Sequence, residues 1–115
     1  MNRHFTSGQV QFHAAELLLG LNYLHSQSIL YRSLKPENVM IDADGYVKLV
    51  DFSNSKFLQS KQALTSTICG SSQYMAPEMV FGSRYGLEVD WWNLGIFLYE
   101  LATKTLPFIG KTDTS

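Results

Sequence analysis

The chain has 115 residues, a length that fits one domain, and 45% of them are hydrophobic. This composition supplies enough apolar side chains for a core, so it excludes an intrinsically disordered chain. Nine basic and ten acidic residues give a net charge of -1, and neither the balance nor its pattern points to nucleic acid or to an anionic membrane surface. A single cysteine, Cys69, excludes a disulfide framework.

The N-terminal part of the chain predicts one amphipathic helix. Thr6 and Gln9 have the spacing of a capping box, which satisfies free backbone amides at a helix start. Apolar residues then recur at helical spacing through Val10, Ala14, Leu17, Leu18, Leu21 and Leu24. We therefore predict a helix over residues 8–26.

The start of the chain and its apolar runs bear on where the protein is located. Residues 1–5 are followed by no long apolar run, so they do not have the pattern of a signal peptide. The longest apolar stretches are too short to span a bilayer. We expect an intracellular protein, in the cytoplasm or the nucleus, with no membrane contact.

Short apolar runs after the helix predict strands. They cover residues 29–31, 39–41 and 46–50, and Asp44-Gly45 between the last two predicts a two-residue hairpin turn. Residues 42–45 resemble the start of a calcium loop, but the later ligand positions and the closing glutamate are missing, which argues against calcium.

The C-terminal half predicts a long loop and a second helix. Residues 53–75 are polar and without a period, and loops of that length are generally functional or disordered. Residues 90–104 are apolar on nearly every side of a helix, as expected for a central helix covered from several directions. The predicted fold class is therefore α+β, mainly helical, with a short β-hairpin beside a central helix.

Four segments then resemble protein-kinase motifs in the order found in that family. Residues 31–38, Tyr-Arg-Ser-Leu-Lys-Pro-Glu-Asn, are similar to the catalytic loop, and Asp51-Phe52-Ser53 to the metal-binding Asp-Phe-Gly. Ala76-Pro77-Glu78 matches the end of the activation segment, and residues 90–95 the start of the central helix. The resemblance covers almost the whole chain and implies a partial kinase large lobe over residues 1–115.

Finer features resemble one group within that family. Tyr31 stands where most kinases have histidine, and Thr67 opens the segment Thr-Ile-Cys-Gly. With the paired tryptophans at 91–92 and Pro107-Phe108, these features are similar to cAMP- and cGMP-dependent protein kinases of the AGC group.

The resemblance implies ATP and Mg²⁺ as cofactors. Asn38 and Asp51 correspond to the metal ligands, and both offer the hard oxygen atoms that Mg²⁺ prefers. Lys35 would neutralise the transferring phosphoryl group, and Met40 matches a position beneath adenine. The alternative for Asn38 and Asp51 is a cap beside the hairpin and a turn residue.

The resemblance also implies a protein substrate or docking partner with basic residues. Glu37 and Glu100 match carboxylates that pair with an arginine two residues before the target hydroxyl, since a carboxylate can hold the planar guanidinium bidentately. The alternative is a pair of solvated surface carboxylates. The pocket for the residue after the target hydroxyl would involve Ile68, Ser72 and Met75.

Further positions carry regulatory and structural roles by resemblance. Thr67 matches the activation-loop phosphosite, where Arg32 and Lys56 could pair with the phosphate, and the alternative is an ordinary loop threonine. A stack that ties the catalytic loop to the central helix would be formed by Tyr31, Phe52 and Asp90. The histidines lack metal-ligand spacing to one another and are expected to be surface or helix-packing residues.

Two substitutions depart from the family pattern. Ser33 occupies the position of the aspartate that acts as general base, and losing a positioned base costs on the order of 10²–10⁴ in rate. Ser53 replaces a glycine, whose backbone freedom serine lacks, so the placement of Asp51 is in question.

Segments of the kinase pattern are also missing from these residues. They contain no Gly-x-Gly-x-x-Gly sequence and no Val-Ala-Ile-Lys-type lysine before the catalytic loop. We expect the ATP-covering small lobe to be absent, together with the arginine that normally pairs with Glu78. The helix over 90–104 would then expose an apolar surface for association.

Three hypotheses follow. The first is a catalytically impaired, pseudokinase-like module that acts by binding. The second is an incomplete gene model of an active Ser/Thr protein kinase, and the third is a decaying copy without function.

Overall fold

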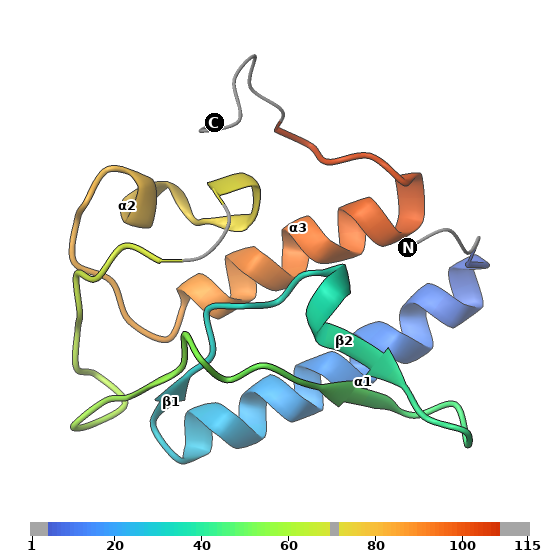
Figure 1. The fold of residues 1–115 in the computed structure, drawn as a ribbon, viewed down its shortest axis with the longest axis horizontal. Helices are drawn as coiled ribbons and strands as arrows, with labels where there is room; N and C mark the ends of the chain where they lie inside the picture. Colours follow the sequence, from blue (N-terminus) through green and yellow to red (C-terminus); the bar gives the residue numbers. More distant parts are fainter. Residues whose placement is uncertain (1–4, 70–71, 109–115) are drawn as a thin grey trace.

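Two long helices form the frame of the protein. The computed structural model describes residues 5–69 and 72–108. Helix α1 (Ser7–Ser26) and helix α3 (Val89–Thr103) lie side by side, as Figure 1 shows. Between them in the chain lie two short β-ladders and the small helix α2 (Pro77–Val80). This arrangement agrees with the predicted fold class, a mainly helical α+β chain with a hairpin beside a central helix.

Helix α1 begins where the capping box predicts. The backbone N–H of Gln9 donates to Thr6 Oγ1 at 3.1 Å, and the backbone N–H of Thr6 donates to Gln9 Oε1 at 2.9 Å. These reciprocal bonds satisfy amides that a helix start leaves without partners. The face toward α3 buries Leu17, Leu21 and, near the C-terminal end, His25.

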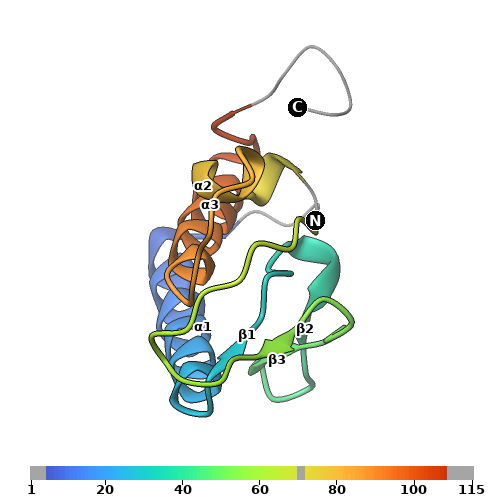
Figure 2. The same ribbon diagram turned by 90° about the vertical axis from the view of Figure 1, so that its left-hand side faces the viewer.

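The strands pair in two small antiparallel ladders. Strand β2 (Val39–Ile41) pairs with β3 (Val47–Leu49), and β1 (Ile29–Leu30) pairs with β4 (Lys56–Phe57). Figure 2 shows the β2–β3 hairpin beside the two long helices, as a second layer.

The predicted two-residue turn at Asp44-Gly45 is wrong. The N–H of Asp42 donates to the Tyr46 carbonyl at 2.9 Å, so the loop consists of residues 43–45. Only Gly45 among them has a positive φ, 87°, which fits a type I turn followed by a glycine bulge. The carboxylate of Asp42 explains the longer loop, because its Oδ1 accepts hydrogen bonds from the backbone N–H groups of Asp44 and Tyr46.

The segment predicted as one long loop contains some regular structure. Besides β4, residues 53–75 include a 3₁₀ turn, Ser72–Tyr74, and a bridge between Thr65 and Tyr85. These pairings join residues distant in sequence, so no local period signals them.

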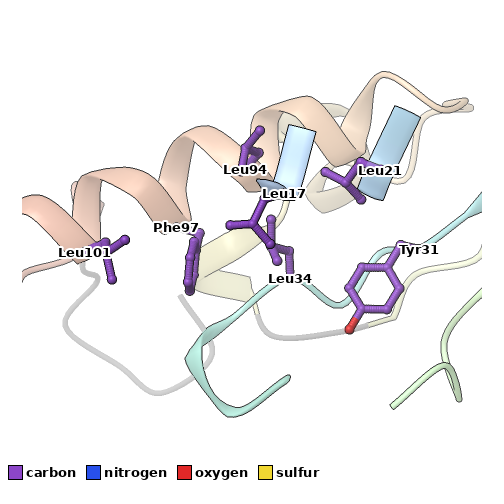
Figure 3. Close-up of a cluster of buried hydrophobic side chains, with 7 residues drawn as sticks. All are labelled: Leu17, Leu21, Tyr31, Leu34, Leu94, Phe97 and Leu101. Carbon is purple, nitrogen blue, oxygen red and sulfur yellow. The ribbon is translucent and has the colours of Figure 1, made fainter. Parts of the chain in front are cut away.

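The core consists of two clusters of buried side chains. Figure 3 shows the first, which joins α1, the loop after β1 and α3 through Leu17, Leu21, Tyr31, Leu34, Leu94, Phe97 and Leu101. The second lies under the C-terminal half and contains Leu30, Leu58, Ala76, Met79, Tyr85 and Val89. The first cluster contains Tyr31 and Leu34 from the segment that follows β1, and the second contains Leu30 from β1 itself, so this part of the chain contributes to both.

Helix α3 buries one broad face rather than its whole circumference. Trp91 and Trp92 each remain 37% exposed, and Tyr99 is 46% exposed. The buried face includes two polar residues, Asp90 and Asn93, which hold the adjacent loop.

Within the described ranges, no helix is long and apolar enough to cross a membrane.

Candidate functional site

Asp90, at the start of α3, fixes the beginning of the loop at residues 31–38. Its side chain is buried, and its Oδ2 accepts a hydrogen bond from the Tyr31 N–H at 2.9 Å. Its Oδ1 accepts from the Arg32 N–H at 2.8 Å. His25 Nε2 lies 2.8 Å from the same Oδ2, so the carboxylate joins α1, the loop and α3.

Asn93, one turn further along α3, fixes the middle of the loop. Its Oδ1 accepts from the Leu34 N–H at 2.9 Å, and its Nδ2 donates to the Leu34 carbonyl at 2.5 Å. Both backbone groups of a buried residue are thereby satisfied by one side chain. Together Asp90 and Asn93 determine the path of the loop on both sides of Ser33.

Tyr31 and Phe52 form the predicted stack with Asp90. Their rings meet edge to face at 5.2 Å, and the Tyr31 hydroxyl donates to the Val50 carbonyl at 2.5 Å. Burial raises the pKa of Tyr31 well above its ordinary value, and the negative charges of Asp51 and Asp90 add to the effect. The stack therefore connects α3 to the segment that carries Asp51.

Ser33 lies at the centre of this loop, and its hydroxyl has no hydrogen-bond partner among the described residues. Its side chain is 7% exposed. Ser33 lines a cavity of about 20 Å³, whose walls include Lys35, Asn54, Tyr74 and Asn93. A hydroxyl here cannot take up a proton as a carboxylate would.

The hairpin places Asn38 and Asp51 near each other. The Val50 N–H donates to the Asn38 carbonyl at 3.0 Å, and Asp51 is the next residue in the chain. The Asn38 side chain is buried and donates through Nδ2 to the Ser33 carbonyl at 2.7 Å, which leaves Oδ1 as an acceptor. The two sequence-predicted metal ligands thus leave the same end of the β2–β3 ladder.

The Asp51 carboxylate bonds to Ser53. Its Oδ1 accepts from the Ser53 hydroxyl at 2.6 Å and from the Ser53 N–H at 3.1 Å. These two bonds, hydroxyl first, lower the pKa of Asp51, and the positive charge of Lys35 adds to them. The positive φ in this segment, 62°, lies at Asp51 and not at Ser53, so serine at position 53 does not bear the backbone strain that its replacement of glycine suggested.

The donor chemistry of this pair fits Mg²⁺. One amide oxygen and one ionised carboxylate are the hard oxygen ligands that Mg²⁺ takes, and it usually completes its shell with phosphate oxygens and water. No group of three or more His, Cys, Asp or Glu side chains that could hold a metal occurs within residues 5–69 and 72–108.

Met40, predicted beneath adenine, is 55% exposed.

The two predicted substrate carboxylates both affect Tyr74. The Tyr74 hydroxyl donates to Glu100 Oε1, and the pKa of Tyr74 is raised by burial, by this bond and by the charges of Glu100 and Glu37. The negative charges of both carboxylates therefore raise the pKa of the same side chain, although the two residues are 63 positions apart in the sequence. Tyr74 was not singled out from the sequence, because its contact is tertiary and lies in a segment without a period.

Two of the three residues predicted for the pocket of the residue after the target hydroxyl line the same groove. Ser72 and Met75 line an open groove of about 260 Å³ with Pro77, Val80, Phe81, Trp92 and Phe108. Ile68 is 59% exposed and is not among the residues that line this groove.

Arg32 and Lys56 reach the segment around Thr67 by different routes. The Arg32 guanidinium donates to the Asn54 carbonyl at 2.7 Å and to the Tyr85 hydroxyl at 3.0 Å. That hydroxyl donates in turn to the Thr67 carbonyl. Lys56 donates to Thr65 Oγ1 at 2.8 Å, while the Thr67 side chain is exposed.

Three contributors to this site were given no role from the sequence. His25 was expected only as a surface or helix-packing residue, Asn93 only as part of the central-helix motif, and Tyr85 carried no prediction. All three side chains are buried, which distinguishes them from ordinary polar surface residues. Their burial depends on contacts between distant segments, so the sequence alone does not indicate it.

Comparison with known proteins supports the kinase resemblance. The family model described as protein kinase domain matches residues 1–115. Ribosomal protein S6 kinase alpha-1 of Homo sapiens is 45% identical over 107 residues, which cover 93% of this chain and 15% of that protein. Ribosomal protein S6 kinase 2 alpha of Xenopus laevis gives the same identity and coverage, and putative ribosomal protein S6 kinase alpha-1 of Caenorhabditis elegans is 44% identical.

The chain spans about 15% of the length of these curated relatives. The match extends over nearly all of this chain, at an identity that establishes common descent, and it coincides with the four motifs of the site. The chain therefore belongs to the protein kinase domain family, in its AGC group of serine/threonine kinases.

Proposed function

We propose that this chain is a pseudokinase-like large-lobe module that binds protein segments with a basic residue and transfers phosphate poorly. The observation that carries the proposal is the state of Ser33. The loop around it is fixed by Asp90 and Asn93, yet the residue at the base position is a buried hydroxyl without a partner among the described residues. A preserved frame around a lost base favours binding over catalysis.

The binding part of the proposal rests on Glu37 and Glu100. Both carboxylates act on Tyr74, and Glu37 is exposed while Glu100 is half-buried. A guanidinium could replace the Tyr74 hydroxyl as the partner of Glu100 and form charge-assisted bonds with both carboxylates. The partner would be a protein segment with arginine two residues before a serine or threonine, in the cytoplasm or nucleus and without nucleic acid.

We include ATP and Mg²⁺ as cofactors in this proposal because the chain belongs to the protein kinase family. Asn38 and Asp51 would hold the metal ion, Lys35 would contact the phosphoryl group, and Met40 would lie against adenine. Bound ATP would supply the phosphoryl group, while the chain's own residues would orient it. With serine at position 33, no carboxylate is in place to accept the proton of the acceptor hydroxyl.

Peptide binding tests the proposal directly. Fluorescence anisotropy would compare a labelled peptide carrying Arg two residues before Ser with the same peptide carrying Ala in place of Arg. We expect the Arg peptide to bind at least tenfold more tightly, with the difference reduced in Glu100→Gln and unchanged in Asp44→Asn, an exposed carboxylate on the hairpin loop. Equal binding of the two peptides would reject the proposed recognition.

An active kinase is the second candidate, favoured by the retained Lys35, Asn38 and Asp51. A thermal-shift titration with ATP and Mg²⁺, beside ATP with EDTA, separates it from the first. Ligand that binds only the folded state raises the melting temperature with the logarithm of its concentration over Kd. A magnesium-dependent shift together with phosphate transfer would favour this candidate. The absence of any cooperative melt would instead favour a decaying copy without function.

A further inference from the structure

We propose that Ser53 is a positioning residue that holds the Asp51 carboxylate against its own loop and thereby weakens the hold of Asp51 on a divalent cation. This inference rests on the proposed metal pair of Asn38 and Asp51. It assigns a role to the one residue of the Asp-Phe-Ser segment that the family pattern leaves unexplained, because the family has glycine there.

The contacts single out one carboxylate oxygen. Asp51 Oδ1 receives both the Ser53 hydroxyl, at 2.6 Å, and the Ser53 N–H, at 3.1 Å. A distance of 2.6 Å is that of a charge-assisted O–H···O⁻ bond, which is about twice as strong as a bond between neutral groups. A cation that binds through Oδ1 must therefore displace the hydroxyl or share the oxygen with two donors.

The backbone reinforces the arrangement. Asp51 has a φ of 62°, in the left-handed region that most residues other than glycine avoid. Aspartate is among the few residues that tolerate this region, because its side chain can bond the backbone two residues on. The bonds to Ser53 thus stabilise both the orientation of the carboxylate and the turn that presents it.

The backbone bond does not depend on the side chain at position 53, whereas the hydroxyl bond does. Alanine there would keep the N–H donor and remove only the hydroxyl, and threonine would keep both. The structure therefore offers a pair of substitutions that differ in the one contact under test.

Mn²⁺ binding measures the effect without any phosphate transfer. Electron paramagnetic resonance would measure the concentration of free Mn²⁺ in titrations of four chains: wild type, Ser53→Ala, Ser53→Thr and Asp51→Asn. We expect Ser53→Ala to bind Mn²⁺ at least about tenfold more tightly, as expected for removal of one bond to a charged group. Ser53→Thr should match the wild-type chain, and Asp51→Asn should lose most of the affinity.

Three results would overturn the inference. Equal affinity in Ser53→Ala and the wild-type chain would mean that the hydroxyl does not compete. Weaker Mn²⁺ binding in Ser53→Ala would indicate that the hydroxyl is itself a ligand. If no variant bound Mn²⁺, the Ser53 hydroxyl would not be the cause of weak cation binding. Peptide anisotropy on the same variants keeps the proposed function separate, since loss of peptide binding alongside an intact Ser53 effect would reject only the former.

Discussion

His25 and Asp90 meet across the helix interface, with Nε2 of the histidine 2.8 Å from Oδ2 of the aspartate and both side chains buried. The contact joins the end of α1 to the start of α3. Because the same carboxylate also accepts the N–H groups of Tyr31 and Arg32, one side chain fixes two helices and the loop between them.

Replacing Asp90 should destabilise the fold strongly. Asp90→Ala removes the acceptor of two backbone N–H groups and leaves His25 buried without its partner, a change of about 3–5 kcal/mol in the free energy of unfolding. Urea denaturation of the wild-type chain and the variant measures the difference. Asp44→Ala, an exposed carboxylate of the hairpin loop, is the control and should change it by less than about 0.5 kcal/mol. A loss below about 1 kcal/mol for Asp90→Ala would contradict the assigned role.

Two substitutions at Asn93 should separate its two bonds to Leu34. Asn93→Asp keeps an acceptor for the Leu34 N–H but loses the donor to the Leu34 carbonyl, whereas Asn93→Ala loses both. Each variant should lower the free energy of unfolding by about 1–3 kcal/mol, since a buried group is left unsatisfied. Amide hydrogen exchange distinguishes them, because the Leu34 amide should stay protected in Asn93→Asp and exchange faster in Asn93→Ala. Equal protection in both would show that the amide has another partner.

Stability should fall at alkaline pH because of buried tyrosines. The pKa values of Tyr31, Tyr74 and Tyr85 are all raised above the ordinary value of 10.0, chiefly by burial. The unfolded chain releases these protons near pH 10 while the folded chain retains them, so the contribution is fully present below pH 10 and is lost as pH rises toward the folded-state values. Melting temperatures should therefore decline between pH 10 and 12.

Tyr74→Phe provides the control for that decline. Phenylalanine cannot ionise, so the pH-dependent loss between pH 10 and 12 should be smaller in the variant, although its stability at neutral pH is also lower without the bond to Glu100. The slope against pH is the readout, and the same slope in both chains would argue against a raised pKa at Tyr74.

Elements with local signals could be predicted from the sequence. The capping box at Thr6 and the apolar period of α1 depend on neighbours within a few residues, and the structure starts that helix one residue before the predicted range. The helix predicted over 90–104 appears as Val89–Thr103. The hairpin was also predicted, but its loop length depended on the Asp42 carboxylate, which propensities at Asp44-Gly45 do not report.

Contacts between distant segments could not be predicted in this way. The β1–β4 ladder joins two-residue strands that carry no period of their own. Tyr74 and Tyr85 became part of the site only through Glu100 and Arg32, which are remote in the chain. The positions of the candidate site were predicted from the kinase resemblance, which depends on motifs and not on contacts between distant segments.

Two buried hydroxyls provide the last prediction, because they should respond to removal with opposite signs. Ser33 and Thr65 are each 7% exposed, but Ser33 Oγ has no partner among the described residues, whereas Thr65 Oγ1 accepts from Lys56 at 2.8 Å. A buried hydroxyl without a hydrogen bond costs about 1–3 kcal/mol. Ser33→Ala should therefore raise the free energy of unfolding by about 1 kcal/mol, since it removes a group that burial penalises.

Thr65→Val is the matched comparison, because it replaces a hydroxyl by a methyl group of similar size. It removes a satisfied hydrogen bond and should lower the free energy of unfolding by about 1 kcal/mol. Urea denaturation of both variants beside the wild-type chain gives the two signs in one series. If Ser33→Ala were instead destabilising, the Ser33 hydroxyl would have a hydrogen-bond partner in solution. The adjacent cavity of about 20 Å³ is large enough to hold a water molecule that could be that partner. A rise would show that the fold itself disfavours a hydroxyl at the base position, as expected for a buried polar group without a partner.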